Sequence, residues 1–256
     1  MDVRLMPNPQ GGYQFLPGVP YVSSAARAAD GFEVVRASFR RPRRLFPEGL
    51  ADVESHLRSL GRPVQALCGL ELRFGRQATL EEFDAFNKVY IDRMSKAGLL
   101  IDDRAPIART NVAVPGSPAE HQIHAFSYTV PVSRPELQPP PTFVVAATPE
   151  VLPPGGPPGV AAPYDTSPEG LRQKTAVILE TLGSRLAALG ARWSDVTGVQ
   201  LYTVHNLHEL LSTMVRPALG EAGGRGIEWH FAQPPVVGLE IELDARSTRM
   251  ELTVDT

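Results

Sequence analysis

The sequence predicts an α+β protein with two tandem domains, each with the element order β-α-β-α-β-β. The main observation is an internal repeat. Residues 56–74 (HLRSLGRPVQALCGLELRF) align without a gap on residues 185–203 (RLAALGARWSDVTGVQLYT), 129 positions later. Apolar residues and glycines coincide, as Gly61 and Gly190 do, whereas polar residues differ. Two copies of one helix-turn-strand unit, half a chain apart, indicate two domains of one fold.

A proline cluster near the middle of the 256-residue chain supports this division. Residues 135–141 (PELQPPP) interrupt regular structure and can form a stiff, extended connector. We therefore predict a first domain at residues 1–134, a proline-rich linker at 135–141 and a second domain at 142–256. Each half is long enough to form a core of its own.

Hydrophobic periodicity predicts the elements of the first half. Helical spacing of apolar residues predicts a helix that Gly61 ends in the left-handed region. The pattern Thr79-Leu-Glu-Glu82 is a capping box, which starts a second helix at Leu80. The expected elements are strands at 32–39, 67–74, 107–114 and 122–130, and helices at 48–60 and from 80 onward.

The second half repeats this order. Ser167 and Pro168 form a helix start, with a capping hydroxyl followed by a proline in the first turn. The expected elements are strands at 143–147, 196–204, 227–232 and 239–243, a candidate strand at 250–254, and helices at 168–189 and 207–218.

Composition limits the classes of partner. The net charge of −3 offers no electrostatic attraction to nucleic acid or to an anionic membrane. The sequence has no run of about 18 apolar residues, and its N-terminus does not resemble a signal peptide. The single cysteine, Cys68, excludes an internal disulfide framework. We expect a cytoplasmic protein that binds neither nucleic acid nor membrane.

Segments 83–90 (FDAFNKVY), 108–112 (ARTNV), 173–204 and 239–245 (LEIELDA) cover much of both halves. In these segments the chain resembles the RidA (YjgF) family. This resemblance implies a chorismate-mutase-like fold, a homotrimer with clefts between neighbouring domains, and chemistry that needs neither a metal nor an organic cofactor. Segments 13–24 (YQFLPGVPYVSS), 108–112 and 125–131 (AFSYTVP) are more similar still to a longer, two-domain branch, the 2-aminomuconate and 2-amino-5-chloromuconate deaminases of aromatic-compound degradation.

The resemblance also implies catalytic residues. Family members hold a substrate carboxylate with an arginine just before a strand, and Arg109 matches it well. A glutamate on the last strand positions water, and Glu240 matches it in the second half. In the first half, the residue fifteen positions after Arg109 is His124, just as Glu240 lies fifteen positions after Arg225. Glu120 and Gln122 are nearby. The first half therefore carries the arginine without the glutamate, which departs from the ordinary family pattern.

Further residues are candidates for substrate binding. Arg40 belongs to a run of five arginines at positions 36–44, one of which could meet a second carboxylate. Arg225 is a weak arginine match in the second half, Asn87 offers a polar contact on the second helix, and Ser24 offers a hydroxyl. His121 and His124 are three residues apart, so on a strand they point to opposite faces and do not form a metal pair.

These residues suit hydrolysis of an enamine or imine dicarboxylate such as 2-aminomuconate, with release of ammonia. Arginine pairs two-for-two with a carboxylate, and a histidine or carboxylate can move the protons. Two alternatives remain open. One is a non-catalytic trimeric module that binds a small acid, and the other is a chorismate-mutase-type pericyclic enzyme.

Overall fold

Both halves of the chain contribute to one twelve-stranded sheet. The computed structural model describes residues 4–18, 22–118, 120–133, 140–152 and 159–255. Along the sheet the strand order is β10-β9-β11-β8-β3-β6-β5-β7-β4-β12, and the β1-β2 hairpin joins it at β3. The strands are β1 (Met6–Asn8), β2 (Tyr13–Pro17), β3 (Ser23–Ala28), β4 (Phe32–Arg44), β5 (Leu67–Phe74), β6 (Ala108–Ala113), β7 (Gln122–Pro131), β8 (Phe143–Pro149), β9 (Gly198–Tyr202), β10 (Glu228–His230), β11 (Glu242–Ser247) and β12 (Met250–Val254).

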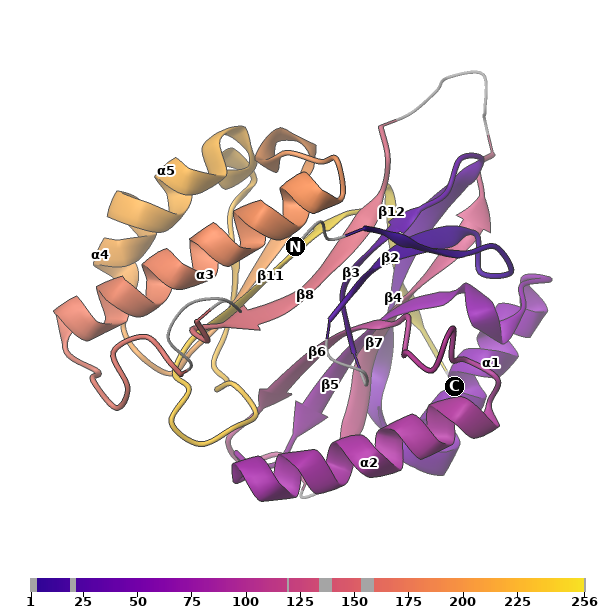
Figure 1. The fold of residues 1–256 in the computed structure, drawn as a ribbon, viewed down its shortest axis with the longest axis horizontal. Coiled ribbons are helices and arrows are strands. Elements are labelled where there is room, and N and C mark those ends of the chain that lie inside the picture. Colours follow the sequence, from indigo (N-terminus) through magenta and orange to yellow (C-terminus); the bar gives the residue numbers. More distant parts are fainter. Residues whose placement is uncertain (1–3, 19–21, 119, 134–139, 153–158, 256) are drawn as a thin grey trace.

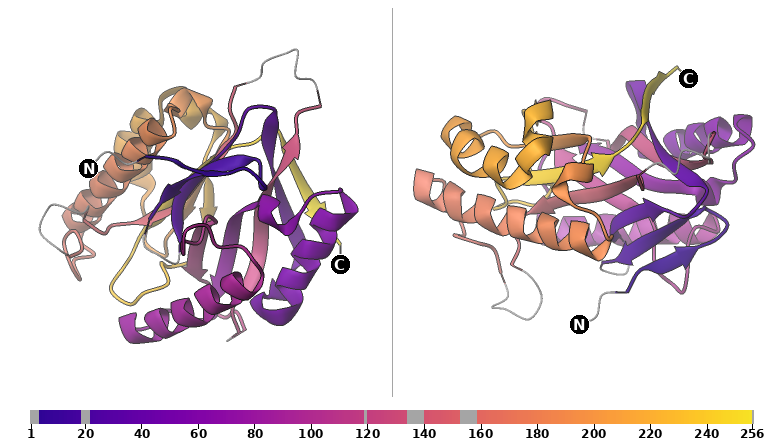
Figure 2. Two further views of the ribbon diagram at one scale, coloured as in Figure 1. Left: turned by 45° about the vertical axis from the view of Figure 1, so that its right-hand side comes forward. Right: turned by 90° about the horizontal axis from the view of Figure 1, so that it is seen from above.

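The last two strands make the sheet curl onto itself. β11 pairs with β8 and β9, whereas β12, only two residues further along the chain, pairs in parallel with β4 at the far end. The sheet order runs from β11 through β8, β3, β6, β5, β7 and β4 to β12 (Figure 2). Side chains of β11 and β12 meet, because Arg246 donates to Glu251 at 2.7 Å, so the sheet is strongly curved between these two strands. One face of the curved sheet is an interior and the other carries the helices.

The helices cover two separate parts of the outer face (Figure 1). α1 (Leu50–Ser59) and α2 (Leu80–Lys96) lie over the first-half strands, where Leu57, Leu70 and Phe126 belong to one buried cluster. α3 (Pro168–Ala188) and the segment α4 (His208–Leu210), η5 (Leu211–Val215) and α5 (Arg216–Leu219) lie over the second-half strands. Short helical turns complete the fold: η1 (Leu45–Gly49), η2 (Val64–Ala66), η4 (Trp193–Asp195) and η6 (Gly220–Arg225).

The expected α+β class is confirmed, and the division into two tandem domains stays a prediction. Each half keeps its own hydrophobic cluster, but a third cluster at the seam combines Phe15 with Cys68 and Val144. β3 also pairs with β8 across the expected boundary. Most of the expected linker, residues 135–139, lies outside the described residues.

Most expected elements appear where periodicity placed them, one expectation needs correction, and three strands were not expected. β5 has the expected bounds, and Gly61 has a φ of 67° after α1. The strand expected at 239–243 begins only at Glu242, because the N–H groups of Glu240 and Ile241 donate to the carboxylate of Glu150 instead of to a neighbouring strand. Strands β1, β2 and β3 had no expected counterpart.

The capping box fixes where α2 begins. The Thr79 hydroxyl accepts from the N–H of Glu82, and the Glu82 carboxylate accepts from the N–H of Thr79 at 2.9 Å. Starting there, the helix directs Phe86 and Tyr90 at the sheet.

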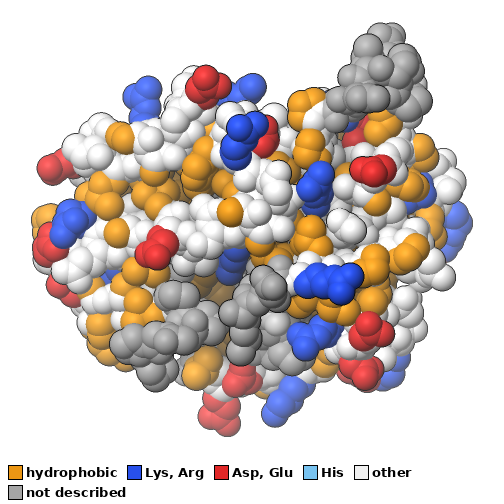
Figure 3. Space-filling model, turned by 45° about the horizontal axis from the view of Figure 1, so that its top comes forward, with side chains coloured by type: hydrophobic (Ala, Val, Ile, Leu, Met, Phe, Trp, Pro, Cys, Tyr) orange, Lys and Arg blue, Asp and Glu red, His pale blue; other side chains and the backbone are white. Residues whose placement is uncertain are grey.

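The outer surface carries charges of both signs. On the face drawn in Figure 3, basic and acidic side chains are interspersed and form no patch of a single sign. Among the described residues, no helix is long and apolar enough to cross a membrane.

Candidate active site

Arg109 lies on β6 and points toward α2. Alternation along the strand explains this, because its neighbours Ala108 and Thr110 face the interior of the sheet. The Nη2 atom of Arg109 donates to the side-chain oxygen of Asn87 on α2. Its guanidinium carbon lies 4.2 Å from the centre of the Tyr90 ring and 5.1 Å from that of Phe86. The structure thus brings together the predicted residues Arg109 and Asn87, in a buried position under two aromatic rings.

A cavity of about 140 Å³ lies beside this arginine. Phe86 belongs both to the cavity wall and to the ring pair that contacts Arg109. The wall is mainly aromatic, with charged groups from Arg76 and Glu82. Its residues come from the end of β5, the start of α2 and the approach to β7: Phe74, Gly75, Arg76, Ala78, Glu82, Phe83, Phe86 and His121.

His121 is the titratable base of this cavity. Its ring stacks on Phe74 with centres 4.0 Å apart and meets Phe86 edge-on at 4.6 Å. Burial lowers the pKa of His121, and the positive charges of Arg109 and Arg76 lower it further. The imidazole is therefore neutral at pH 7 and able to accept a proton. Its Nδ1 atom is buried and has no hydrogen-bond partner among the described residues.

Two amide groups near this face are also incompletely bonded. The side-chain nitrogen of Asn87 and the side-chain oxygen of Asn111 are buried without a hydrogen-bond partner in the described part of the chain. Asn111 follows Arg109 by two residues on β6, so both side chains leave the same face. Buried polar atoms are nearly always bonded, so each of these two atoms can take a hydrogen bond from or to a water or a polar ligand.

His124 lies on the opposite face of the sheet from Arg109, which corrects the expectation of one first-half site containing both. Burial lowers the pKa of His124 to about 4, and the charge of Arg73 adds to the effect while Glu71 opposes it. Glu71 lines the interior cavity, so His124 faces inward and His121 faces the helices. The two histidines lie on opposite faces as expected, but the predicted acid–base residue, His124, is the inward one.

The other predicted first-half residues lie apart from the cavity. Glu120 is exposed and pairs with Arg44 at 2.9 Å, and Arg40 is exposed and pairs with Asp255. Gln122 is half-buried on β7 opposite Arg73 and Arg44, and Ser24 is half-buried on β3. None of these four lines the cavity beside Arg109 among the residues described.

The chain as a whole matches a family model described as 2-aminomuconate deaminase CnbZ, over residues 5–252. It is also 38% identical over 252 residues to the 2-amino-5-chloromuconate deaminase of Comamonas testosteroni, covering 94% of this chain and 95% of that protein. The chain belongs to the 2-aminomuconate deaminase family. A chorismatase crystal structure is similar in fold alone, with a TM-score of 0.51 and 17% identity over 88% of this chain and 77% of the other.

In this member of the family, Glu240 forms a pair that was not predicted from the sequence. Its carboxylate lies 2.6 Å from the Nε2 atom of His205, and both side chains are partly exposed. Glu150 accepts from the N–H of Glu240 at 2.7 Å, and the fully buried Lys174 balances its charge at 3.2 Å. Glu240 therefore sits on a rigid support but does not line the cavity beside Arg109. Arg225 is exposed at the end of η6.

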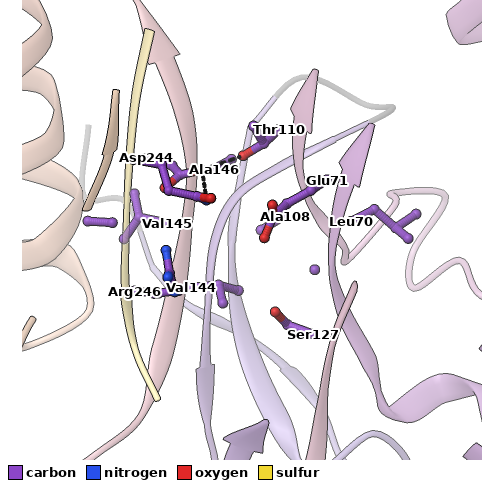
Figure 4. Close-up of a pocket in the computed structure, with 13 residues that line it drawn as sticks. Leu70, Glu71, Ala108, Thr110, Ser127, Val144, Val145, Ala146, Asp244 and Arg246 are labelled. Carbon is purple, nitrogen blue, oxygen red and sulfur yellow. Dashed lines mark hydrogen bonds between the residues drawn. The ribbon is translucent and has the colours of Figure 1, made fainter. Parts of the chain in front are cut away.

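A second polar cluster fills the interior of the curled sheet. Arg36 donates to both oxygens of Glu71 at 2.6 and 2.9 Å, and Arg246 donates to Glu251 at 2.7 Å. Between them a cavity of about 20 Å³ is large enough for roughly one water molecule. In Figure 4 the Asp244 carboxylate points across this cavity at Thr110, which donates to it at 3.3 Å.

This interior cluster was not predicted, although the sequence carries a signal for it. Charged residues alternate with apolar ones on two strands that are buried on both faces: Glu71 and Arg73 on β5, and Asp244 and Arg246 on β11. No group of three or more His, Cys, Asp or Glu side chains could hold a metal ion within the described ranges.

Proposed function

We propose that this family member is a hydrolytic deaminase of an unsaturated amino dicarboxylate such as 2-aminomuconate or its chloro-substituted form, and that it releases ammonia. The observation that carries the proposal is the arrangement of buried Arg109, the aromatic cavity and the neutral base His121. Membership of the 2-aminomuconate deaminase family and the 38% identity to a 2-amino-5-chloromuconate deaminase support it.

The cavity suits a small conjugated acid. A cavity of about 150 Å³ lined by apolar side chains can hold a benzene ring, and the cavity beside Arg109 has a volume of about 140 Å³. Flat aromatic walls match the plane of a diene. The guanidinium of Arg109 can form two parallel hydrogen bonds with one substrate carboxylate. The Phe86 ring lies against this guanidinium, so it must rotate to another side-chain rotamer before the carboxylate can reach Arg109.

The proposed reaction uses protons and water only. The enamine first becomes an imine: a proton adds to the carbon beside C2, and the nitrogen gives up one proton. His121 then takes a proton from water as the water oxygen bonds to C2, and this proton passes to the imine nitrogen. In the resulting carbinolamine the hydroxyl proton moves to the amine through water, the C–N bond breaks, ammonia leaves and a 2-keto acid remains. One water is consumed and one ammonia is released for each substrate, without an organic cofactor.

Ammonia release from freshly generated 2-aminomuconate, followed together with loss of its ultraviolet band, tests the proposal. Arg109→Ala should lower kcat/KM by roughly 10²- to 10³-fold, because removing one partner of a buried, hydrogen-bonded charge pair costs about 2–5 kcal/mol. Arg109→Lys should recover only a small part, because an ammonium lacks the planar fork. Arg58→Ala is the matched control, since Arg58 is exposed and pairs only with Glu54 on α1 in the described structure.

Full activity of Arg109→Ala would overturn the proposed role of Arg109. A wild-type protein that binds the substrate without producing ammonia would instead be a small-acid binding module, and turnover of chorismate without ammonia would indicate pericyclic chemistry. The homotrimer expected from the resemblance remains a proposal that light scattering in solution would test.

A further inference from the structure

We propose that Arg76 binds the second carboxylate of the substrate at the rim of the cavity, so that this site selects dicarboxylates over monocarboxylates. The inference rests on the proposed function for the location of the substrate. It assigns the second cation to a residue outside the arginine run at positions 36–44. Arg40, the member of that run expected to bind substrate, is exposed and pairs with Asp255.

The position of Arg76 carries the first part of the argument. It follows β5 by two residues, where the chain leaves the sheet, and it lines the same cavity as His121. Its side chain is 70% exposed, so it marks the side on which the cavity meets solvent. Arg109 is only 3% exposed and lies behind the Phe86 wall. A diacid in this cavity would therefore lie between a deep arginine and a shallow one.

His121 is influenced by both Arg109 and Arg76. The charges of Arg109 and Arg76 both disfavour protonation of its imidazole. The geometry agrees, because Arg76 lines the same cavity as His121. Arg109 contacts the ring of Phe86, which His121 meets edge-on. A planar anion beside His121 would thus experience attraction from both arginines.

Glu82 shows how Arg76 would hold a carboxylate. Its two oxygens accept from Nη2 and Nη1 of Arg76 at 2.7 and 2.9 Å, the two-for-two geometry that guanidinium and carboxylate prefer. Because both side chains are largely exposed, such a pair contributes little to stability, and a substrate carboxylate can replace Glu82 or share the fork at small cost. Glu82 keeps its hydrogen bond to the N–H of Thr79 in either case.

Two pairs of ligands test the inference. Calorimetry with the unreactive diacid cis,cis-muconate and the monoacid sorbate gives Kd values whether or not the protein is a deaminase. Arg76→Gln should weaken muconate binding about tenfold and leave sorbate binding within twofold. In turnover, the variant should raise KM for 2-aminomuconate about tenfold with kcat within threefold, and KM for 2-amino-2,4-pentadienoate should not change.

Matched variants separate recognition from structure. Arg58→Gln removes an equally exposed arginine elsewhere and should change none of these constants. Glu82→Gln removes the competing charge and should tighten muconate binding without affecting sorbate. An Arg76→Gln variant that binds muconate as wild type does, or that weakens both ligands equally, would overturn the inference. If the wild type released no ammonia but Arg76→Gln still weakened the binding of muconate and not of sorbate, only the proposed reaction would be overturned.

Discussion

Replacing Asp244 by Asn should stabilise the protein above pH 6 and leave its stability almost unchanged near pH 4. Asp244 lies on β11 in the interior of the sheet and is 5% exposed. Burial raises its pKa from the usual 3.8 to about 6, and the nearby carboxylate of Glu71 raises it further, against the opposing charge of Arg246. The folded protein therefore holds this proton more tightly than the unfolded chain does.

The size of the effect follows from the two pKa values. A difference of about two pH units corresponds to about 3 kcal/mol. The stabilising contribution is fully present below the unfolded pKa, near 4, and is lost as the pH rises through about 6. Asn resembles the protonated acid in shape and keeps an oxygen for Tyr202, whose hydroxyl donates to Asp244 at 2.9 Å. The stability of the Asp244→Asn variant does not depend on pH in this way, because an amide does not titrate.

Urea denaturation of wild type and Asp244→Asn at several pH values between 4 and 8 measures this difference. The variant should gain about 3 kcal/mol over wild type by pH 8, or a Tm higher by roughly 6–12 °C, given the usual 2–4 °C per kcal/mol for a chain of this size. Asp92→Asn, at an exposed ion pair with Lys96, is the control and should show no trend. A variant less stable than wild type at pH 8 would show that the ionised carboxylate stabilises the fold, which refutes the reasoning.

Three further predictions concern the remaining polar contacts. Lys174→Met should cost about 3–5 kcal/mol of unfolding free energy in a denaturant titration, because it leaves Glu150 buried without its cation, and adding Glu150→Gln should recover part of the loss. Thr79→Ala should lower the same free energy by about 1 kcal/mol, since it removes the cap of α2, and a loss above 3 kcal/mol would contradict a purely local role. His121→Asn should lower kcat/KM by roughly 10²-fold or more and abolish the acid limb of the pH–rate profile, which should lie below pH 6.5. An unchanged acid limb would exclude His121 as the base.

Local signals predicted the parts of the fold that depend on neighbouring residues. The Thr79 capping box and the left-handed Gly61 act within a few residues, so α2 begins and α1 ends as expected. β3 was missed because its sequence, SSAARA, lacks the branched and aromatic side chains typical of strands. It is a strand because it lies between β8 and β2, a cause found only in the tertiary structure.

The site residues that lie in family-like sequence motifs could be predicted. Arg109 and Asn87 came from segments that resemble the family, and the structure joins them. His121 and Arg76 were missed because the ends of two strands, β5 and β7, bring them to one cavity. The alternation that separates His121 from His124 was visible in the sequence, but which face held Arg109 was not.

The parallel pairing of β12 with β4 has a consequence for how the chain folds during synthesis. Residues that touch across this pair, such as Arg36 and Glu251, are 215 positions apart. A ribosome therefore releases the whole first half before the strand that covers the outer edge of β4 exists. Contacts of such long range form slowly, and an uncovered edge strand invites pairing with other chains. Loss of residues 250–254 should therefore cause aggregation more than local fraying, because it leaves the outer edge of β4 unpaired.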